Sequence, residues 1–299
     1  MAIEDQNKPD LPAVELITIN HNGREFLNDY FRALCELEYP QDKLHLYFVD
    51  NNSRDGSLDY LRRSSVPFKL TVIANKKNYG FARASNMVFK RCSAPYVGLL
   101  NNDTKVDRMW LARLVEKIQS DSSVGMVSSR EIPQEASRKI DPQTNEISWC
   151  CGGHCLIRSL ALEKTGYFDE RFFMYAEDVD LSWRMWLAGY KCVNVPQALC
   201  EHHHTKIEQY RIRRLYFYVR NSILLRYAYG TGRQIQKAIA RWSWEAGSLG
   251  LKRLRLKEAC TVALAVLAHL FYIPYFLKKR KNLIASANFK EVRRQWIIL

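Results

Sequence analysis

The sequence predicts an α/β fold with a mostly parallel central sheet, followed by a basic, helical C-terminal extension. In roughly the first 200 residues, short apolar runs alternate with stretches of helical periodicity, an order typical of parallel sheets. Residues 205–299 contain 20 Lys and Arg against 4 Asp and Glu, whereas the rest of the chain has 25 against 27. With 299 residues, 47% of them hydrophobic, the chain can bury a substantial core, which excludes a disordered or low-complexity protein.

Predicted strands and helices alternate in the first half of the chain. We expect four buried strands, from the apolar runs at residues 14–19, 44–49, 69–74 and 96–100. Helical periodicity between these strands occurs at residues 25–37, 58–63 and 81–92. Because ligands gather where parallel strands end, the polar clusters at residues 50–55 and 101–104 are the first candidates for a binding site.

The second half of the chain continues this alternation and then changes composition. We expect helices at residues 110–119, 159–165 and 178–188, and strands at residues 124–128 and 191–195. The polar residues 131–146 predict a loop. After Thr205 the chain becomes basic and aromatic, which places a domain boundary between residues 1–204 and a mostly helical, membrane-associating region at residues 205–299.

The cysteines and the N-terminus indicate a reducing, cytoplasmic compartment. The eight cysteines show neither the regular framework of a secreted domain nor a Cys-x-x-Cys pair. Cys150, Cys151, His154 and Cys155 lie close together, but their spacing is not that of a zinc site, so packing explains them better. The first 11 residues carry charges and no apolar stretch, so no secretory signal is expected.

Two polar clusters carry candidate binding chemistry. Asp50 follows a predicted strand, where a carboxylate can accept from a base or a ribose hydroxyl, although a solvated turn explains it equally well. Asp103 follows another apolar run, and one or two such carboxylates suffice to hold Mg²⁺. The chain lacks Gly-x-Gly-x-x-Gly and a phosphate-binding Gly-Lys-Ser/Thr loop, which argues against a dehydrogenase or a P-loop enzyme.

A third cluster consists of Glu177, Asp178 and Asp180, between an aromatic run and a tryptophan-rich helix. Adjacent carboxylates repel each other, so one of them can have a raised pKa, which suits a general base. The alternative is an acidic helix start that the helix dipole stabilises. Among the three histidines at residues 202–204, a histidine at the strand end is a candidate metal ligand.

The order and spacing of these motifs resemble family 2 glycosyltransferases. Four runs are similar to the nucleotide-sugar-binding half of that family: residues 14–22 (VELITINHN), 49–57 (VDNNSRDGS), 78–82 (NYGFA) and 99–104 (LLNNDT). Residues 166–189, which begin GYFDERFFMYAEDVDL, look like its acceptor and catalytic-base segment, particularly in the bacterial rhamnosyltransferase-like branch. Residues 218–221 (YVRN) look like the segment that follows in that branch.

The resemblance implies a GT-A fold, an inverting transfer and a divalent cation, Mg²⁺ or Mn²⁺. The Asp-x-Asp metal motif of the family maps onto residues 101–103, where this chain departs from the pattern with Asn101 in the first position. Asp103 would then be the main carboxylate ligand of the cation, helped by His202.

The resemblance also assigns the substrate sites. Asp178 maps onto the catalytic base and Glu177 onto its neighbour, and Asp50 would contact the uracil or thymine-ribose end of the donor. The donor-nucleotide site would comprise Asn20, Asn22, Asp50, Asn52, Asn78, Gly80, Phe81 and Asn102. The acceptor would be bordered by Trp149, Gly152 and Gly153.

Residues 259–277 carry no charged Asp, Glu, Lys or Arg side chain and approach the roughly 20 residues that a membrane-spanning helix needs. Basic residues flank both ends, so both ends favour the cytoplasmic side, which predicts an in-plane or re-entrant element. An ordinary buried helix pair or a homo-oligomer interface is the alternative. We therefore expect the protein at the cytoplasmic face of the cell membrane, against anionic lipid.

Together these features predict an inverting hexosyltransferase that moves L-rhamnose from dTDP-rhamnose to a polyprenyl-diphosphate-linked glycan in cell-surface polysaccharide biosynthesis. Another nucleotide sugar such as UDP-galactofuranose is the first alternative. The second is a noncatalytic protein that binds lipid or nucleic acid through the basic extension and has a degenerate transferase domain. Intact Asp103 and Asp178 disfavour degeneracy, and no nucleic-acid partner is expected.

Overall fold

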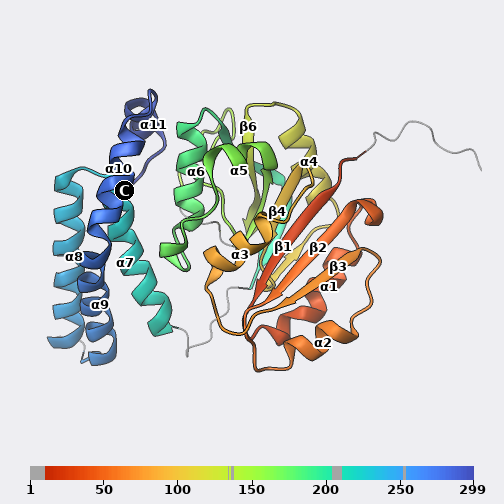
Figure 1. The fold of residues 1–299 in the computed structure, drawn as a ribbon, viewed down its shortest axis with the longest axis horizontal. Coiled ribbons are helices and arrows are strands. Elements are labelled where there is room, and N and C mark those ends of the chain that lie inside the picture. The colour runs from red at the N-terminus through yellow and green to blue at the C-terminus, as the bar shows by residue number, and fades with distance from the viewer. Residues whose placement is uncertain (1–10, 134, 136–137, 204–210, 252–253) are drawn as a thin grey trace, which may run out of the picture.

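One eight-stranded sheet forms the centre of the molecule (Figure 1). The structure is a computed structural model that describes residues 11–299 except 134, 136–137, 204–210 and 252–253, so the predicted boundary at residue 205 and the charged N-terminus lie outside the described residues. The strand order is β3-β2-β1-β4-β7-β6-β8-β5. The strands are β1 (Val14–Asn20), β2 (Leu44–Asp50), β3 (Lys69–Ala74), β4 (Tyr96–Leu100), β5 (Thr104–Val106), β6 (Val124–Ile132), β7 (His154–Arg158) and β8 (Lys191–His202).

Helices cover both faces of this sheet. They are α1 (Leu27–Cys35), α2 (Ser57–Arg63), α3 (Phe81–Phe89), α4 (Trp110–Gln119), α5 (Ser159–Thr165) and α6 (Glu177–Leu187). Successive side chains of a strand point to opposite faces. Leu16 of β1 accordingly lies in one core with α1 and α4, whereas Ile17 lies in the other core with α3, α5 and α6. Short 3-10 helices are η1 (Arg24–Phe26), η2 (Gln41–Lys43), η3 (Glu170–Phe172) and η5 (His269–Tyr272).

The sheet is mostly parallel, as the sequence predicts, with four parallel pairings that join β3, β2, β1 and β4 and that join β6 to β8. The sequence does not predict the antiparallel strands β5 and β7. It also ends two strands too early, because β6 continues to Ile132 and β8 to His202. Pro196 and a register shift interrupt β8, and Glu131 is a buried acidic residue in β6, so neither extension has an apolar pattern.

The C-terminal extension is helical, as predicted, and packs against the α6 side of the sheet (Figure 1). Its helices are α7 (Arg211–Tyr229), α8 (Gly232–Leu251), α9 (Leu256–Ala268), α10 (Ile273–Ile284) and α11 (Phe289–Gln295). α7, α8 and α9 share a small core of their own. Phe276 and Trp296, however, belong to the same core as α6, and the Trp296 ring stacks on Trp186 with 4.4 Å between centroids. The extension is therefore part of the folded unit that holds α6.

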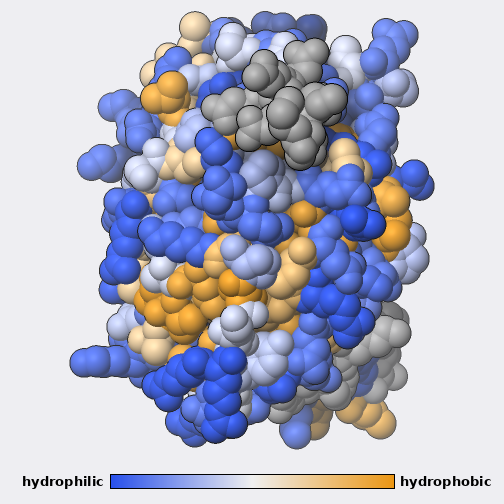
Figure 2. Space-filling view, turned by 90° about the vertical axis from the view of Figure 1, so that its right-hand side faces the viewer, coloured by the Kyte–Doolittle hydropathy of each residue, from blue (hydrophilic) through white to orange (hydrophobic). Residues whose placement is uncertain are grey.

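The other end of the sheet, at the β3 edge, presents a mostly hydrophilic face with one apolar patch near its middle (Figure 2). Within the described part of the chain, residues 11–110 contribute no large hydrophobic side chain that is mostly exposed. Most such side chains belong to α8, α9, α10 and the turns between them. Exposed apolar surface is thus concentrated on the extension.

Candidate active site

A cleft opens at the carboxyl ends of β1, β2 and β4, where the sequence places its polar clusters. It encloses about 190 Å³ and is partly open to solvent. Five residues predicted for the donor site line it: Asn22, Asn78, Gly80, Phe81 and Asn102. The other lining residues are Ile19, His21, Gly23, Phe26, Asn51, Phe173, Met174, Arg213 and Arg214.

Three residues predicted for the donor site, Asn20, Asp50 and Asn52, do not line this cleft. Asp50 is 2% exposed, and its carboxylate accepts from Asn20 Nδ2 at 2.9 Å and from the backbone N–H of Ser53 at 3.0 Å. The Asn20 amide oxygen in turn accepts from Asn102 Nδ2 at 2.6 Å. These contacts join the ends of β1, β2 and β4. In this structure Asp50 and Asn20 therefore support the cleft by holding Asn102, which lines it, and do not line it themselves.

Asn51 is a cleft residue within the predicted polar cluster at residues 50–55, although the sequence analysis gave it no role of its own. Its buried amide donates to Asn78 Oδ1 at 3.0 Å and to the carbonyl of Gly80 at 3.2 Å. Its oxygen accepts from Asn75 Nδ2 at 3.1 Å and from the backbone N–H of Tyr79 at 3.0 Å. Asn51 therefore fixes the loop at residues 75–80 against the end of β2, and the only sequence signal was its place beside Asp50.

Gly80 brings this loop against the chain just before α6. Its φ of +80° favours glycine, and an added Cβ would lie 2.5 Å from the carbonyl oxygen of Phe173. The backbone N–H of Ala82 donates to the same oxygen at 3.2 Å. A side chain at residue 80 would therefore separate the donor loop from Phe173.

Asp103 and His202 form the candidate cation site. Antiparallel pairing of β5 with β8 sets Thr104 opposite His202, which leaves Asp103 Oδ1 3.2 Å from His202 Nε2. Neighbouring ligands of an octahedral Mg²⁺ or Mn²⁺ lie about 3 Å apart, since each lies about 2.1 Å from the metal. The two atoms therefore fit a shared divalent cation.

Glu131 orients His202 from behind. Its Oε1 lies 3.1 Å from His202 Nδ1, an arrangement typical of a carboxylate that positions a metal-binding histidine. Burial alone would lower the pKa of His202, but hydrogen bonds with Asp103 and Glu131 raise it to about 9. A divalent cation that binds His202 Nε2 would displace the proton from that nitrogen.

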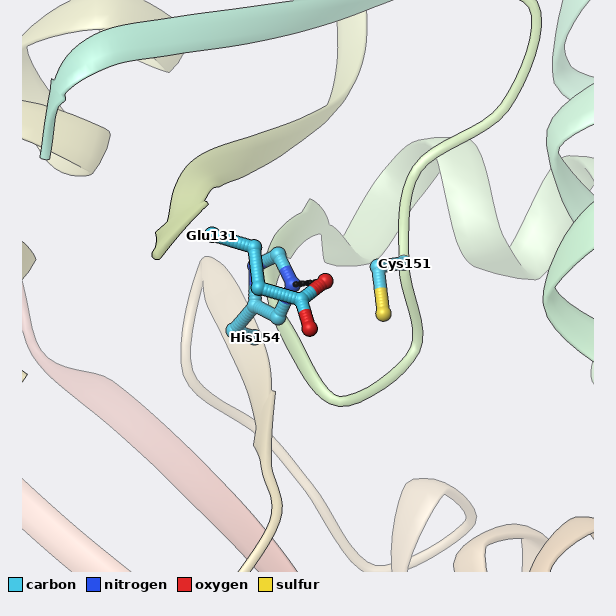
Figure 3. A group of neighbouring side chains, drawn as sticks. All are labelled: Glu131, Cys151 and His154. Carbon is cyan, nitrogen blue, oxygen red and sulfur yellow. Dashed lines mark ion pairs between the residues drawn. The ribbon is translucent and has the colours of Figure 1, made fainter. Parts of the chain in front are cut away.

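A second group of potential ligands, Glu131, Cys151 and His154, lies next to this pair (Figure 3). Glu131 and His154 point toward each other, with 3.5 Å between Oε2 and Nε2. Burial raises the pKa of the Cys151 thiol far above its usual range, so the sulfur keeps its proton unless a metal ion displaces it. Cys150 and Cys155 are fully buried in the core, as packing cysteines would be. Glu131 thus faces both histidines, with a hydrogen bond to His202 and a longer contact with His154.

Asp178 lies at the start of α6 beside the predicted acceptor residues. Its carboxylate accepts from the backbone N–H of Gly152 at 2.9 Å and of Val179 at 2.8 Å. An added Cβ on Gly152 would lie 3.1 Å from Asp178 Cβ and 3.6 Å from Phe81, so this glycine lies between Asp178 and a residue that lines the cleft. The carbonyl of Gly153 accepts from the backbone N–H of Asn101 at 2.8 Å, which ties the same loop to the end of β4.

The two adjacent carboxyl groups differ in their surroundings. Burial raises the pKa of half-buried Asp178, and two backbone N–H groups hold its carboxylate. Glu177 is 5% exposed, its Oε2 has no hydrogen-bond partner, and burial together with the charge of Asp178 raises its pKa well above the usual range. Asp178 therefore carries the negative charge of the pair, whereas Glu177 stays neutral.

Arg213 and Arg214, from the first turn of α7, line the donor cleft, although the sequence analysis assigned them to the membrane region. The Arg213 guanidinium lies over the Phe173 ring, 4.8 Å from its centroid. Cationic side chains at this place suit a diphosphate ligand.

Trp149, predicted for the acceptor side, is half-buried, and the centroid of its ring lies 5.9 Å from the Arg138 guanidinium.

The sheet and its cleft are those of the GT-A fold, and solved structures of glycosyltransferases resemble the chain. The mannosyltransferase PcManGT from Pyrobaculum calidifontis, in complex with GDP-Man and Mn²⁺, has a TM-score of 0.60 and 21% identity over 94% of this chain and 90% of that one. Residues 1–349 of S. aureus TarS, in complex with UDP-GlcNAc, have a TM-score of 0.58 and 13% identity over 93% and 92%.

The chain belongs to glycosyl transferase family 2, whose sequence model matches residues 15–187. The poly-beta-1,6-N-acetyl-D-glucosamine synthase of Staphylococcus aureus (strain COL) is 24% identical over 66% of this chain and 51% of that protein. The probable glycosyltransferase YdaM of Bacillus subtilis (strain 168) is 24% identical over 65% and 51%. The chain thus spans about half the length of the curated relatives it matches. The predicted family and fold are confirmed, and the rhamnosyltransferase branch stays a prediction.

Proposed function

We propose that this chain is an inverting, cation-dependent glycosyltransferase that moves a sugar from a nucleotide sugar to a hydroxyl of a lipid-linked glycan. One observation carries the proposal: the loop at residues 151–153 links the base candidate Asp178 to the strand end that leads to Asp103 and His202. An inverting transfer needs these two centres on opposite sides of the anomeric carbon, one for the proton and one for the leaving group.

On the donor side, Asp103 and His202 would hold Mg²⁺ or Mn²⁺. When bound, the cation neutralises the charge that develops on the departing nucleoside diphosphate. Asn22, Asn78 and the other cleft residues would hold the nucleotide, and the arginines at the start of α7 would add positive charge near the diphosphate.

On the acceptor side, Asp178 would take the proton of the attacking hydroxyl. Its raised pKa makes it a stronger base than an ordinary aspartate, and the N–H groups of Gly152 and Val179 fix the direction of its carboxylate. The hydroxyl oxygen then forms the new bond to the anomeric carbon while the bond to the diphosphate breaks, with inversion at that carbon.

For the donor we propose dTDP-L-rhamnose and for the acceptor a polyprenyl-diphosphate-linked glycan, because residues 166–189 and 218–221 resemble the rhamnosyltransferase-like branch. UDP-galactofuranose is the alternative donor. A hydrolysis and transfer screen over dTDP-rhamnose, UDP-galactofuranose, UDP-GlcNAc and GDP-mannose, each with Mg²⁺ or Mn²⁺, tests this proposal. Turnover of dTDP-rhamnose alone would support it, preference for another donor would overturn the choice of sugar, and inactivity toward all would favour a noncatalytic protein.

We further propose that residues 205–299 associate with the cytoplasmic face of an anionic membrane. The segment Leu256–Ile284 is apolar enough to cross a membrane by length and composition, with a mean hydropathy of 1.9 and 28% of its apolar window buried. The helix is divided at η5, where Phe271 is 87% exposed. Lys257 and Lys278 lie within the helix and flank its apolar stretch at residues 259–277. Interrupted helices with exposed apolar side chains and basic flanks suit an in-plane element.

A further inference from the structure

The five residues before Glu177, 172–176, have an unusual backbone. Phe173, Tyr175 and Ala176 have φ values of 66°, 66° and 75°, in the left-handed region that non-glycine residues seldom adopt. Such conformations persist only where the surroundings determine them strongly. The loop leads directly into Glu177 and Asp178, so its conformation sets the position of the base.

Two adjacent residues of α7 hold this loop. The Asn221 side-chain amide donates to the carbonyls of Phe172, Met174 and Tyr175 at 2.9, 2.8 and 2.8 Å. Arg220 Nη2 donates to the carbonyls of Arg171 and Phe172 at 2.7 and 3.0 Å. Arg220 Nε also donates to Asn221 Oδ1 at 3.0 Å, so the two side chains act as one unit.

Packing alone does not account for these groups. Arg220 is 4% and Asn221 1% exposed, and among the contacts of the described residues no carboxylate pairs with the Arg220 guanidinium. It is enclosed by aromatic rings, including Phe217 and Tyr272 at 4.9 and 5.2 Å from their centroids. Burial of such a cation is unfavourable, so an apolar side chain would serve packing better.

We propose that Arg220 and Asn221 are positioning residues for the transfer reaction, a proposal that rests on the proposed function. They hold residues 172–176 in the conformation that presents Asp178 to the acceptor. The Phe173 ring extends the same unit to the donor cleft, since it stacks on Phe217 of α7 with 4.7 Å between centroids. The first helix of the C-terminal extension is thereby a part of the active site.

The variant Asn221→Asp tests this role, because it keeps the shape of the side chain and replaces the donating amide by a carboxylate that repels the three carbonyls. A displacement of the base by about 1 Å can cost about 10²-fold in rate, so we expect kcat to fall by about 10- to 100-fold. Nucleotide affinity in calorimetry should change by less than about threefold. Asn282→Asp, the same change on the exposed surface of α10, should leave both unchanged.

Hydrogen exchange gives a readout that does not depend on turnover. Backbone amides of residues 173–177 should exchange faster in Asn221→Asp and in the milder Arg220→Gln, but not in Asn282→Asp. Unchanged kcat with unchanged exchange would overturn the proposal, as would a fall in kcat that only follows a fall in nucleotide affinity. Wild-type inactivity toward every donor, with faster exchange in Asn221→Asp, would overturn the proposed function while sustaining the contact itself.

Discussion

Replacing Asp178 by Asn tests the assignment of the base, because the two side chains have nearly equal volumes and only the carboxylate can take a proton at neutral pH. The carboxylate accepts one hydrogen bond from the N–H of Gly152 and one from that of Val179. The amide keeps one oxygen acceptor and turns its NH₂ group toward the other N–H. One of the two hydrogen bonds is therefore lost.

The effects of this substitution on stability and on rate have different magnitudes. The lost hydrogen bond costs about 1 kcal/mol. Because Glu177 is neutral, no charge repulsion offsets this loss, and in a chain of this size Tm should fall by no more than about 2–4 °C. A positioned general base contributes about 10²–10⁴ in rate, or about 3–5 kcal/mol of the barrier. A loss of turnover on that scale cannot come from unfolding.

Initial rates of glycosyl transfer, calorimetric nucleotide binding and thermal unfolding measure the three quantities. Asp178→Asn should bind nucleotide like the wild type and lose about 10²–10⁴ in kcat. Glu177→Gln is the matched control: since Glu177 is neutral, Gln copies its form, and kcat should stay within about threefold. Near-normal kcat in Asp178→Asn, with inactive Glu177→Gln, would move the base to Glu177, and near-normal kcat in both would refute the assignment.

Three further outcomes follow from other features. As pH rises above about 4.3, the wild type should lose free energy of unfolding relative to Glu177→Gln, because a carboxyl with a raised folded-state pKa stabilises only while protonated; parallel pH profiles would contradict this. Asp103→Ala should abolish the Mg²⁺ or Mn²⁺ dependence of nucleotide-sugar binding in calorimetry, because the cation loses its carboxylate, and unchanged metal dependence would exclude Asp103 as a ligand. Phe271→Glu should weaken flotation with anionic liposomes about tenfold or more, since burial of a Phe side chain contributes about 1.5–3 kcal/mol. Leu160→Glu, at a residue of α5 that is 70% exposed, is its control, and equal flotation of all three proteins would oppose the membrane role.

Strands with an uninterrupted apolar run were predictable from the sequence, and strands held by distant polar partners were not. β1, β2 and β4 are mostly buried and β3 is a half-buried edge strand, and all four end in polar turns, so their number and order follow from local pattern. β5 has three residues, with Lys105 exposed at its centre, which is too short for a periodic signal. Glu131 is buried in β6 against His154 and His202, and no local pattern shows where those histidines lie.

The residues of the candidate site likewise fall into those that the sequence alone could suggest and those that it could not. Asp103, Asp178 and His202 could be proposed from the sequence because the chain presents them in a recognisable order, and their roles stay predictions. Asn51 and Arg213 could not, because their role depends on which loop or helix lies opposite. A basic, aromatic helix has the same composition whether it faces lipid or an active-site cleft, so composition alone assigned α7 to the membrane.

Contacts between α6 and the extension also decide how the membrane role can be tested. Asp180 is fully buried, with Lys279 Nζ 2.6 Å and Arg184 Nε 2.9 Å from its carboxylate oxygens. Burial alone would raise the pKa of Asp180, but these two cations lower it. The Tyr229 hydroxyl donates to the same carboxylate at 2.9 Å. A chain cut near residue 204 would lose Lys279 and Tyr229 and uncover Trp186, so loss of liposome binding would not be separable from damage to the helix that carries the base. Single surface substitutions in the full chain leave α6 intact and so avoid this ambiguity. The contacts of Asp180 with Lys279 and Tyr229 also favour an enzyme whose extension supports catalysis over a degenerate domain with an added lipid-binding tail.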